Sequence, residues 1–191
     1  MGKLVRTIVI LFSMVMATAA VHGIAEDPKA VEKWFEKLTH LKQKLTKFHF
    51  YYHDILSGKN PTSVQVAGFN VSAKSPFLFG LINMFDDKLT LGPNITSKQL
   101  GRAQGIYGAS SLEEVSNFIT MNLVFTDEKY NGSTLALLGR DPVFDRYREM
   151  SIVGGTGFFR LAQGIATAST YSFNATPNSA VLEFHVIVIH Y

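Results

Sequence analysis

The sequence predicts an all-β fold, a closed eight-stranded antiparallel β-barrel with one helix on its N-terminal side. From residue 47 onward, short runs rich in β-branched and aromatic residues alternate with tight turn clusters, and no second helical pattern interrupts them. Several runs are apolar on both faces. This is expected of strands that line an interior suited to an apolar ligand and are covered outside by neighbours, so a barrel is favoured over a β-sandwich.

The first 23 residues have the pattern of a secretory signal peptide. Lys3 and Arg6 form a short basic segment, an apolar run from 7 to 20 follows, and small residues stand at Ala20 and Gly23. A signal anchor is the alternative, but no stop-transfer pattern follows, so no stable membrane span is expected. Cleavage removes two basic residues and no acid, so the net charge falls from +3 to +1. Such a chain has no broad electrostatic attraction to nucleic acid.

Residues 24–46 are expected to form an N-terminal amphipathic helix. Asp27 can cap it, and Pro28 suits the first helical position. Apolar side chains recur at three- and four-residue steps: Val31, Trp34, Phe35, Leu38, Leu41 and Leu45. Lysines occupy much of the remaining surface. A helix packed on the domain, or mobile at its end, is favoured over a helix that binds a membrane surface or a partner.

Residues 47–191 are expected to form the barrel domain. The expected strands cover 47–56, 80–91, 99–110, 115–126, 148–153, 158–170 and 181–191. Asn131-Gly132 lies between two apolar runs and is the strongest hairpin signal in the chain. Gly154-Gly155-Thr156-Gly157 is expected to be another hairpin connection, because the Lys-Ser/Thr of a phosphate-binding loop does not follow it.

Glycosylation motifs and cysteine usage agree with a secreted route. Four N-glycosylation sequons begin at Asn70, Asn94, Asn131 and Asn174. Cysteine is absent, which excludes a disulfide, a thiol nucleophile and a thiolate metal site. A secreted domain without disulfides relies on a sufficient core or on oligomerisation.

No metal site and no cofactor are expected. His49 and His53 have the spacing of two ligands on one helical face, but the aromatic residues around them indicate a strand. Four strand residues span about 13 Å, too far for two ligands of one ion. His185 and His190 are not expected to supply a compact cluster either. No serine stands in a nucleophile elbow, so a hydrolase triad has no support.

Isolated charged and polar residues stand inside the apolar strands. They are Asp54, Arg102, Gln104, Asp141 and Arg148. A charge that faces a barrel interior is costly unless it is paired, and carboxylates with perturbed pKa values in cavities are candidate acids or bases. For each residue alone, a structural ion pair or a strand-end charge is the alternative. The adjacent pair Asp86-Asp87 is interpreted as part of a loop or turn and not as a catalytic dyad.

Four short segments occur in a characteristic order along the predicted barrel. They are Phe50-Tyr51-Tyr52-His53-Asp54-Ile55-Leu56, Gly101-Arg102-Ala103-Gln104-Gly105-Ile106-Tyr107, Asn131-Gly132-Ser133, and Gly154-Gly155-Thr156-Gly157 leading to Gln163-Gly164-Ile165-Ala166. Each segment alone is unspecific, but the ordered set resembles the dirigent family of plants. The resemblance extends from about residue 46 to residue 191.

The resemblance implies an eight-stranded antiparallel barrel of the dirigent and allene-oxide-cyclase type. It further implies a homotrimer exported to the apoplast or cell wall, with a phenolic intermediate held in an apolar cavity. Matched position by position, the family's pocket residues fall on Asp54, Tyr107, Asp141 and Arg148. Arg102 and Gln104, in the same segment as Tyr107, are further candidates for substrate binding.

Two chemistries are known within the family that the chain resembles. Lignan-forming members guide the coupling of two phenoxy radicals made by a separate oxidase, a laccase or peroxidase. Pterocarpan synthases dehydrate a hydroxyisoflavan through a quinone methide and close a ring. This sequence lacks the cysteine pair common in lignan-forming members and has Gly108-Ala109 after Tyr107 instead of a further aromatic. These departures favour the dehydrating branch.

The resemblance implies catalytic roles for Asp54, Asp141 and Arg148 in that branch, with no cofactor. One of the two carboxyls, held protonated by burial, donates a proton to the departing hydroxyl, while Arg148 keeps the other ionised to accept the phenol proton. Tyr107 orients the phenol by hydrogen bonding. The alternatives are a guide for radical coupling and a non-catalytic scaffold of the cell wall. A lipocalin-like carrier is disfavoured because its motifs and disulfides are missing.

Overall fold

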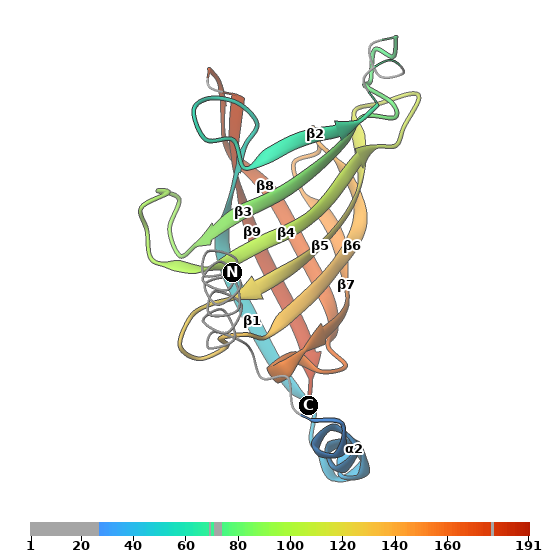
Figure 1. Ribbon diagram of the computed structural model, residues 1–191, viewed down its shortest axis with the longest axis vertical. Helices are drawn as coiled ribbons and strands as arrows, with labels where there is room; N and C mark the ends of the chain where they lie inside the picture. The colour runs from blue at the N-terminus through green and yellow to red at the C-terminus, as the bar shows by residue number, and fades with distance from the viewer. Residues whose placement is uncertain (1–26, 69, 71–73, 177) are drawn as a thin grey trace, which may run out of the picture.

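The computed structural model describes residues 27–191 except for 69, 71–73 and 177, so the predicted signal peptide lies outside the described residues. The described strands form one antiparallel sheet (Figure 1). In chain order they are β1 (Lys44–Ile55), β2 (Ser63–Ala67), β3 (Ile82–Thr90), β4 (Gln99–Ala109), β5 (Ser116–Phe125), β6 (Thr134–Pro142), β7 (Arg148–Thr156), β8 (Gln163–Ala175) and β9 (Asn178–His190).

The sheet closes into a barrel (Figure 1). Eight strands form the ring, and β2 is an extra strand paired with β3. The strand order is β1-β9-β8-β7-β6-β5-β4-β3-β2, and β1 also pairs with β3. β1 pairs with β9 along its whole length, and its Tyr51, Tyr52 and His53 pair with Thr90, Leu89 and Lys88 of β3. Because β1 is hydrogen-bonded on both sides, the barrel has no open edge there. The predicted fold class is confirmed.

The N-terminal helix α2 (Pro28–Glu36) is shorter than predicted. Oδ1 of Asp27 caps it by accepting hydrogen bonds from the backbone N–H groups of Lys29 and Ala30, at 2.9 and 3.1 Å. After Glu36 a 3₁₀ turn (Leu38–His40) follows, and β1 already begins at Lys44. The expected helix over 24–46 is therefore wrong in its last ten residues. Pairing with β9 takes residues 44–46 into the sheet, and this tertiary interaction overrides the local helical period.

Helix α2 lies at the end of the barrel where the chain ends (Figure 1). None of its residues is buried. The guanidinium of Arg160 lies 5.4 Å from the ring centre of Trp34, which links the helix to the loop before β8. Among the described residues, no helix has the length and hydropathy that a membrane crossing requires.

The predicted connections between strands are confirmed in one case and corrected in another. Asn131-Gly132 lies in the loop between β5 and β6, where Gly132 has a φ of 78° that favours glycine. By contrast, Gly154 and Gly155 belong to β7, where they pair with Ala136 and Leu135 of β6. The connection to β8 starts only at Gly157, because β7 leaves β8 after Ile152 and continues along β6. Strand β2 was not predicted.

Two glycines of β4 allow a close approach to β5. A β-carbon added at Gly101 would lie 2.1 Å from the carbonyl oxygen of Val124, and one at Gly105 would lie 2.2 Å from that of Thr120. Neither site can accept a side chain without displacing backbone. The Gly-x-x-x-Gly spacing in the segment 101–107 is therefore explained by the close approach of the β5 backbone to β4 in the coiled barrel wall.

An aromatic cluster fills the barrel interior at the end near the C-terminus. Its members, which we call the aromatic end, are Phe48, Phe125, Tyr130, Phe159 and His190. Phe48 stacks on Phe125 with ring centres 4.9 Å apart, and Tyr130 lies 5.0 Å from Phe159. Phe125 and Phe159 are fully buried. Rings packed in offset and edge-to-face contacts close this end and stabilise the barrel.

Candidate active site

The strand directions bring the predicted polar residues to the other interior end. In an antiparallel barrel, the carboxyl end of one strand lies beside the amino end of the next. Asp54 is near the carboxyl end of β1, Tyr107 near that of β4 and Asp141 near that of β6, while Arg148 begins β7. All four therefore lie at one end of the barrel, opposite the aromatic end. We call this the polar end.

Arg148 and Asp141 form a buried ion pair across the turn from β6 to β7. Nη1 of Arg148 lies 3.4 Å from Oδ1 of Asp141, and the two side chains are 2% and 13% exposed. Arg148 also donates to the carbonyl oxygen of Val143 at 3.4 Å and to Oγ1 of Thr170 at 3.2 Å. Burial raises the pKa of Asp141, while Arg148 and a hydrogen bond from Asn117 oppose that rise. The guanidinium therefore favours the ionised form of this carboxyl.

Asp54 has a more strongly perturbed carboxyl. Burial raises its pKa to about 7, and the neighbouring charges of Asp87 and Asp141 add to the rise. All three influences raise the pKa, and Oδ1 of Asp54 is buried without a hydrogen-bond partner among the described residues. A carboxyl with such a pKa is protonated in a large part of the molecules near neutral pH, and it can donate a proton.

Asp87 is a second buried carboxyl, and it was not predicted as a site residue. Both Asp86 and Asp87 lie in β3, so their interpretation as a turn pair is wrong. Asp87 is fully buried, and burial raises its pKa to about 6 although hydrogen bonds from Thr62 and Tyr52 lower it. The sequence does carry a signal for this orientation: Asp87 alternates in phase with the apolar Phe85 and Leu89, which face the interior.

The hydroxyl of Tyr107 lies beside the side-chain amide of Asn83 and the hydroxyl of Ser63. Nδ2 of Asn83 donates to the Tyr107 hydroxyl oxygen at 2.6 Å, and the hydroxyl of Ser63 lies 3.4 Å from it. Burial raises the pKa of Tyr107 to about 12, so the phenol stays protonated and can donate to a ligand oxygen. Because the Tyr107 oxygen accepts from Asn83, its proton can be donated to Ser63 or to a ligand. Asn83 and Ser63 were not predicted as site residues.

The polar end has unsatisfied hydrogen-bonding capacity. Among the described residues, buried atoms without a partner include Oδ1 of Asp54, Oδ1 of Asn83, Oδ2 of Asp87 and Nε of Arg148. Buried polar groups are nearly always paired in folded proteins, and unpaired ones mark sites for water, ions or ligands. Together they offer donors and acceptors to an oxygen-rich small molecule.

Arg102 and Gln104 do not join this group, which corrects their predicted place in the substrate site. Residues 103, 105 and 107 of β4 face the interior, so Arg102 and Gln104 face outward by the two-residue period of a strand. Nε of Arg102 donates to Oδ1 of Asp86 at 2.5 Å on the outer surface, and Gln104 is exposed.

The histidines also differ from the prediction. His53 is buried and lies 2.7 Å from Oγ1 of Thr90, so it shares no ion with His49. His49 instead meets His185 and Glu183 on the outer face of β1 and β9, with their potential ligand atoms all within 4.8 Å of one another. The expectation that His185 adds no compact cluster is therefore wrong. The cluster forms because β1 and β9, which are far apart in the sequence, pair in a register that places His49 opposite His185.

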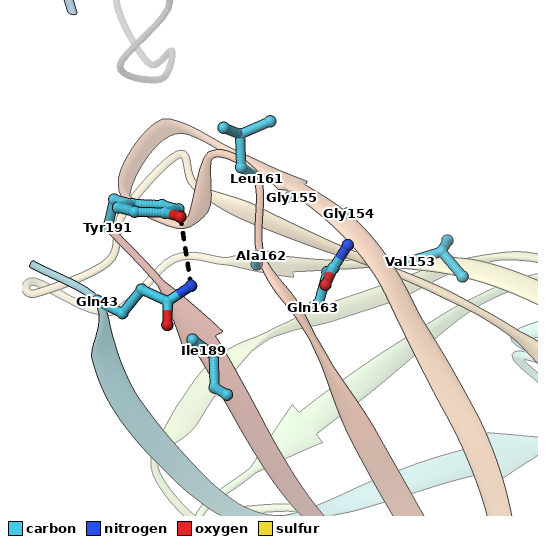
Figure 2. Close-up of a pocket in the computed structure, with 9 residues that line it drawn as sticks. All are labelled: Gln43, Val153, Gly154, Gly155, Leu161, Ala162, Gln163, Ile189 and Tyr191. Atoms are coloured by element: carbon cyan, nitrogen blue, oxygen red, sulfur yellow. Dashed lines mark hydrogen bonds between the residues drawn. The ribbon is translucent and has the colours of Figure 1, made fainter. Parts of the chain in front are cut away.

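A hollow of about 460 Å³ lies at the end where the chain terminates, where β7 separates from β8 (Figure 2). Gln43, Gln163 and Tyr191 supply its side-chain polar groups, and Nε2 of Gln43 donates to the Tyr191 hydroxyl at 3.2 Å. No acidic or basic side chain lines it. This hollow can accommodate a ligand but lacks groups for acid–base catalysis, so we assign the candidate active site to the polar end.

The fold and this site define a class: a closed β-barrel that presents buried acids, a paired arginine and a phenol to a small molecule. The model of the family described as "Dirigent-like protein" matches residues 45–189. The chain belongs to the dirigent family.

Its similarity to known members is high. It is 49% identical to Dirigent protein 21 of Arabidopsis thaliana, covering 79% of this chain and 80% of that protein. It is 42% identical to Pterocarpan synthase 1 of Glycine max, covering 95% and 93%. A solved structure of a pterocarpan synthase dirigent protein matches with a TM-score of 0.72 and 43% identity, covering 78% of this chain and 89% of that one.

Proposed function

We propose that this protein is a dirigent enzyme that dehydrates a hydroxyisoflavan and closes a ring through a quinone methide. The observation that carries the proposal is the pairing of two unlike buried carboxyls at one end of the barrel. Asp54 has a pKa of about 7 and no cation beside it, whereas Asp141 lies against Arg148. Two titratable groups whose environments separate their proton affinities are suited to act as acid and base. Similarity to proteins named pterocarpan synthase supports this reaction class.

In the first step, protonated Asp54 donates to the benzylic hydroxyl. The carbon–oxygen bond breaks and water leaves. The phenol conjugated with that carbon releases its proton to solvent to form the quinone methide, and its oxygen takes a proton back from solvent in the second step. Tyr107, whose oxygen accepts a hydrogen bond from Asn83, donates its own proton to a substrate oxygen and so orients it. The aromatic and aliphatic walls exclude bulk water, which would otherwise add to the electrophilic carbon.

In the second step, a second phenol of the same molecule attacks the electrophilic carbon. Its proton passes to the Asp141 carboxylate, and the quinone methide oxygen regains a proton as the ring becomes aromatic. The new carbon–oxygen bond replaces the one that broke, so the net reaction is the loss of one water. Asp141 returns its proton to Asp54 by exchange with water between turnovers.

The test is an incubation of the mature protein with a racemic hydroxyisoflavan and no oxidase, followed by chiral chromatography. Formation of one ring-closed enantiomer above the spontaneous rate is the expected result. No acceleration would overturn the proposal. In that case, stereoselective coupling of phenoxy radicals in the presence of an added laccase or peroxidase would assign the protein to the radical-guiding branch. Inactivity in both assays would favour a scaffold of the cell wall.

We also propose that the protein acts outside the cell as a glycosylated homotrimer. The first 23 residues have a signal-peptide pattern, and Asn70, Asn94, Asn131 and Asn174 are all exposed. Large apolar side chains are exposed on the barrel wall, among them Met84, Phe118, Leu138, Ile165 and Ile187. Burying such side chains between copies would stabilise an assembly. Light scattering after enzymatic deglycosylation should give three times the chain mass, and a monomer would contradict the trimer.

A further inference from the structure

The outer face of the barrel carries a histidine–histidine–glutamate cluster that the proposed reaction does not use. His49 of β1 lies directly opposite His185 of β9, and Tyr51 lies opposite Glu183. Because alternate residues of a strand point to the same side, Glu183 and His185 share one face of β9 with His49 across the pair. The polar end uses the other face of β1, so this cluster is separate from the candidate active site.

The three side chains already converge at metal-ligand distances. Nε2 of His49 lies 2.7 Å from Oε1 of Glu183, and Nε2 of His185 lies 3.8 Å from the same oxygen. The two imidazole rings stack with centres 4.4 Å apart and an angle of 10° between them. In a tetrahedral zinc site with bonds near 2.0–2.1 Å, ligand atoms are about 3.3 Å apart. The three ligand atoms lie within 4.8 Å of one another, and rotation of the imidazole rings out of their stack would direct their nitrogen lone pairs at one ion.

A neighbouring tyrosine orients the carboxylate. The hydroxyl of Tyr51 donates to Oε1 of Glu183 at 3.2 Å, and the Tyr51 ring is 9% exposed and packs edge-on against Tyr171. Hydrogen bonds of this kind hold metal-binding carboxylates in place in known sites.

We propose that His49, Glu183 and His185 bind one divalent transition metal ion, with Zn²⁺ as the expected ion. Two imidazoles and one carboxylate are the ligand set of zinc sites that keep a fourth position for water, and imidazole nitrogen selects against Mg²⁺ and Ca²⁺. The ligands come from the first and last strands of the barrel. Binding there joins β1 to β9 and stabilises the folded state over the unfolded chain, in which the ligands are far apart.

The experiment uses the mature protein without a polyhistidine tag and Co²⁺ as a spectroscopic probe. We expect visible d–d absorption that saturates at one Co²⁺ per chain and disappears when Zn²⁺ displaces it. His49→Ala and His185→Ala should each weaken Co²⁺ and Zn²⁺ affinity by at least about 10-fold. The matched control is His40→Ala, because His40 is an exposed histidine in the turn before β1.

A thermal measurement supplies the second readout. Zn²⁺ should raise the Tm of the wild type and of His40→Ala, and the shift should be absent in His185→Ala. His49 and His185 are 47% and 60% exposed, so both variants should fold, which near-ultraviolet circular dichroism checks. The proposal would be overturned by no saturable Co²⁺ absorption, by equal affinity in the wild type and His185→Ala, or by equal loss in His40→Ala. None of these outcomes depends on turnover of a phenolic substrate.

Discussion

The two ends of the barrel interior belong to one closed sheet but have opposite chemistry. At the aromatic end, Phe48, Phe125 and Phe159 contact one another in ring–ring packing. At the polar end, burial raises the pKa values of Asp54 and Asp87, and several buried polar atoms of the described residues lack partners. Burial of the rings at the aromatic end thus stabilises the fold, whereas burial of charged groups at the polar end destabilises it. This division predicts that mutations at the two ends affect different properties.

The largest expected effect is on catalysis at the polar end. Asp54→Asn keeps the size of the side chain but removes the acidic proton, so turnover of a hydroxyisoflavan should fall by about 10²- to 10⁴-fold. The folded structure should be retained, because no cation that contacts Asp54 loses its partner. Initial rates from chiral chromatography measure the change. Asp86→Asn, on the outward side of β3, is the control and should keep its activity; full activity in Asp54→Asn would exclude the acid role.

At the aromatic end the effect should be on stability. Phe159→Ala removes a fully buried ring from contacts with Phe48, Phe125 and Tyr130, and it should lower the free energy of unfolding by about 3–5 kcal/mol. Urea unfolding followed by circular dichroism measures this loss. The turnover number per folded molecule should stay close to that of the wild type. A large loss of turnover with unchanged stability would contradict the separation of the two ends.

Buried charge at the polar end should also make stability depend on pH. The pKa of Asp54 is about 7 in the folded protein and near 3.8 in the unfolded chain, so between these values the folded state binds more protons. The contribution of Asp54 to the unfolding free energy is therefore complete below about pH 4 and is lost as the pH rises to about 7. Asp54→Asn should exceed the wild type in unfolding free energy by about 4 kcal/mol at pH 8, and by less than about 1 kcal/mol at pH 4.

Urea unfolding of both proteins at pH 4, 6 and 8 tests this expectation. Asp87 titrates over a nearby range and its charge interacts with Asp54, so the difference between the two proteins measures Asp54 together with its coupling to Asp87. A difference that stays constant over this range would show that the pKa of Asp54 is not raised in the folded state.

Much of this architecture could be predicted because barrels are built from local signals. Alternating strands, the Asn131-Gly132 turn and the Asp27 cap are each determined by nearby residues, and all three agree with the structure. β2 carried no such signal, because Val64 and Val66 of this short strand are both exposed and define no buried face. The end of α2 could not be predicted either, because residues 44–46 enter the sheet only through pairing with a strand more than 130 residues away.

The site residues also divide into those that the sequence could predict and those that depend on pairing between distant strands. Asp54, Asp141 and Arg148 could be selected as isolated charged residues, and Tyr107 from the family resemblance. Antiparallel topology brings all four to one end of the barrel. The metal-ligand cluster needed the register of β1 against β9, which no local spacing contains. The orientation of Arg102 and Gln104 was missed because the inward positions beside them are Gly101, Ala103 and Gly105, which are too small to mark a buried face in the sequence.

Arg102→Ala is therefore the variant with the smallest expected effect, and it separates the two interpretations of this strand. If Arg102 faced the substrate, its loss would reduce turnover strongly. On the outer face it loses only an exposed ion pair with Asp86, which contributes about 0–1 kcal/mol to stability. We expect turnover within about twofold of the wild type. Arg102 lowers the pKa of Asp87, so the variant should raise that pKa slightly, and nuclear magnetic resonance titration of the Asp87 carboxyl measures this change. A tenfold loss of turnover without such a shift would return Arg102 to the substrate site.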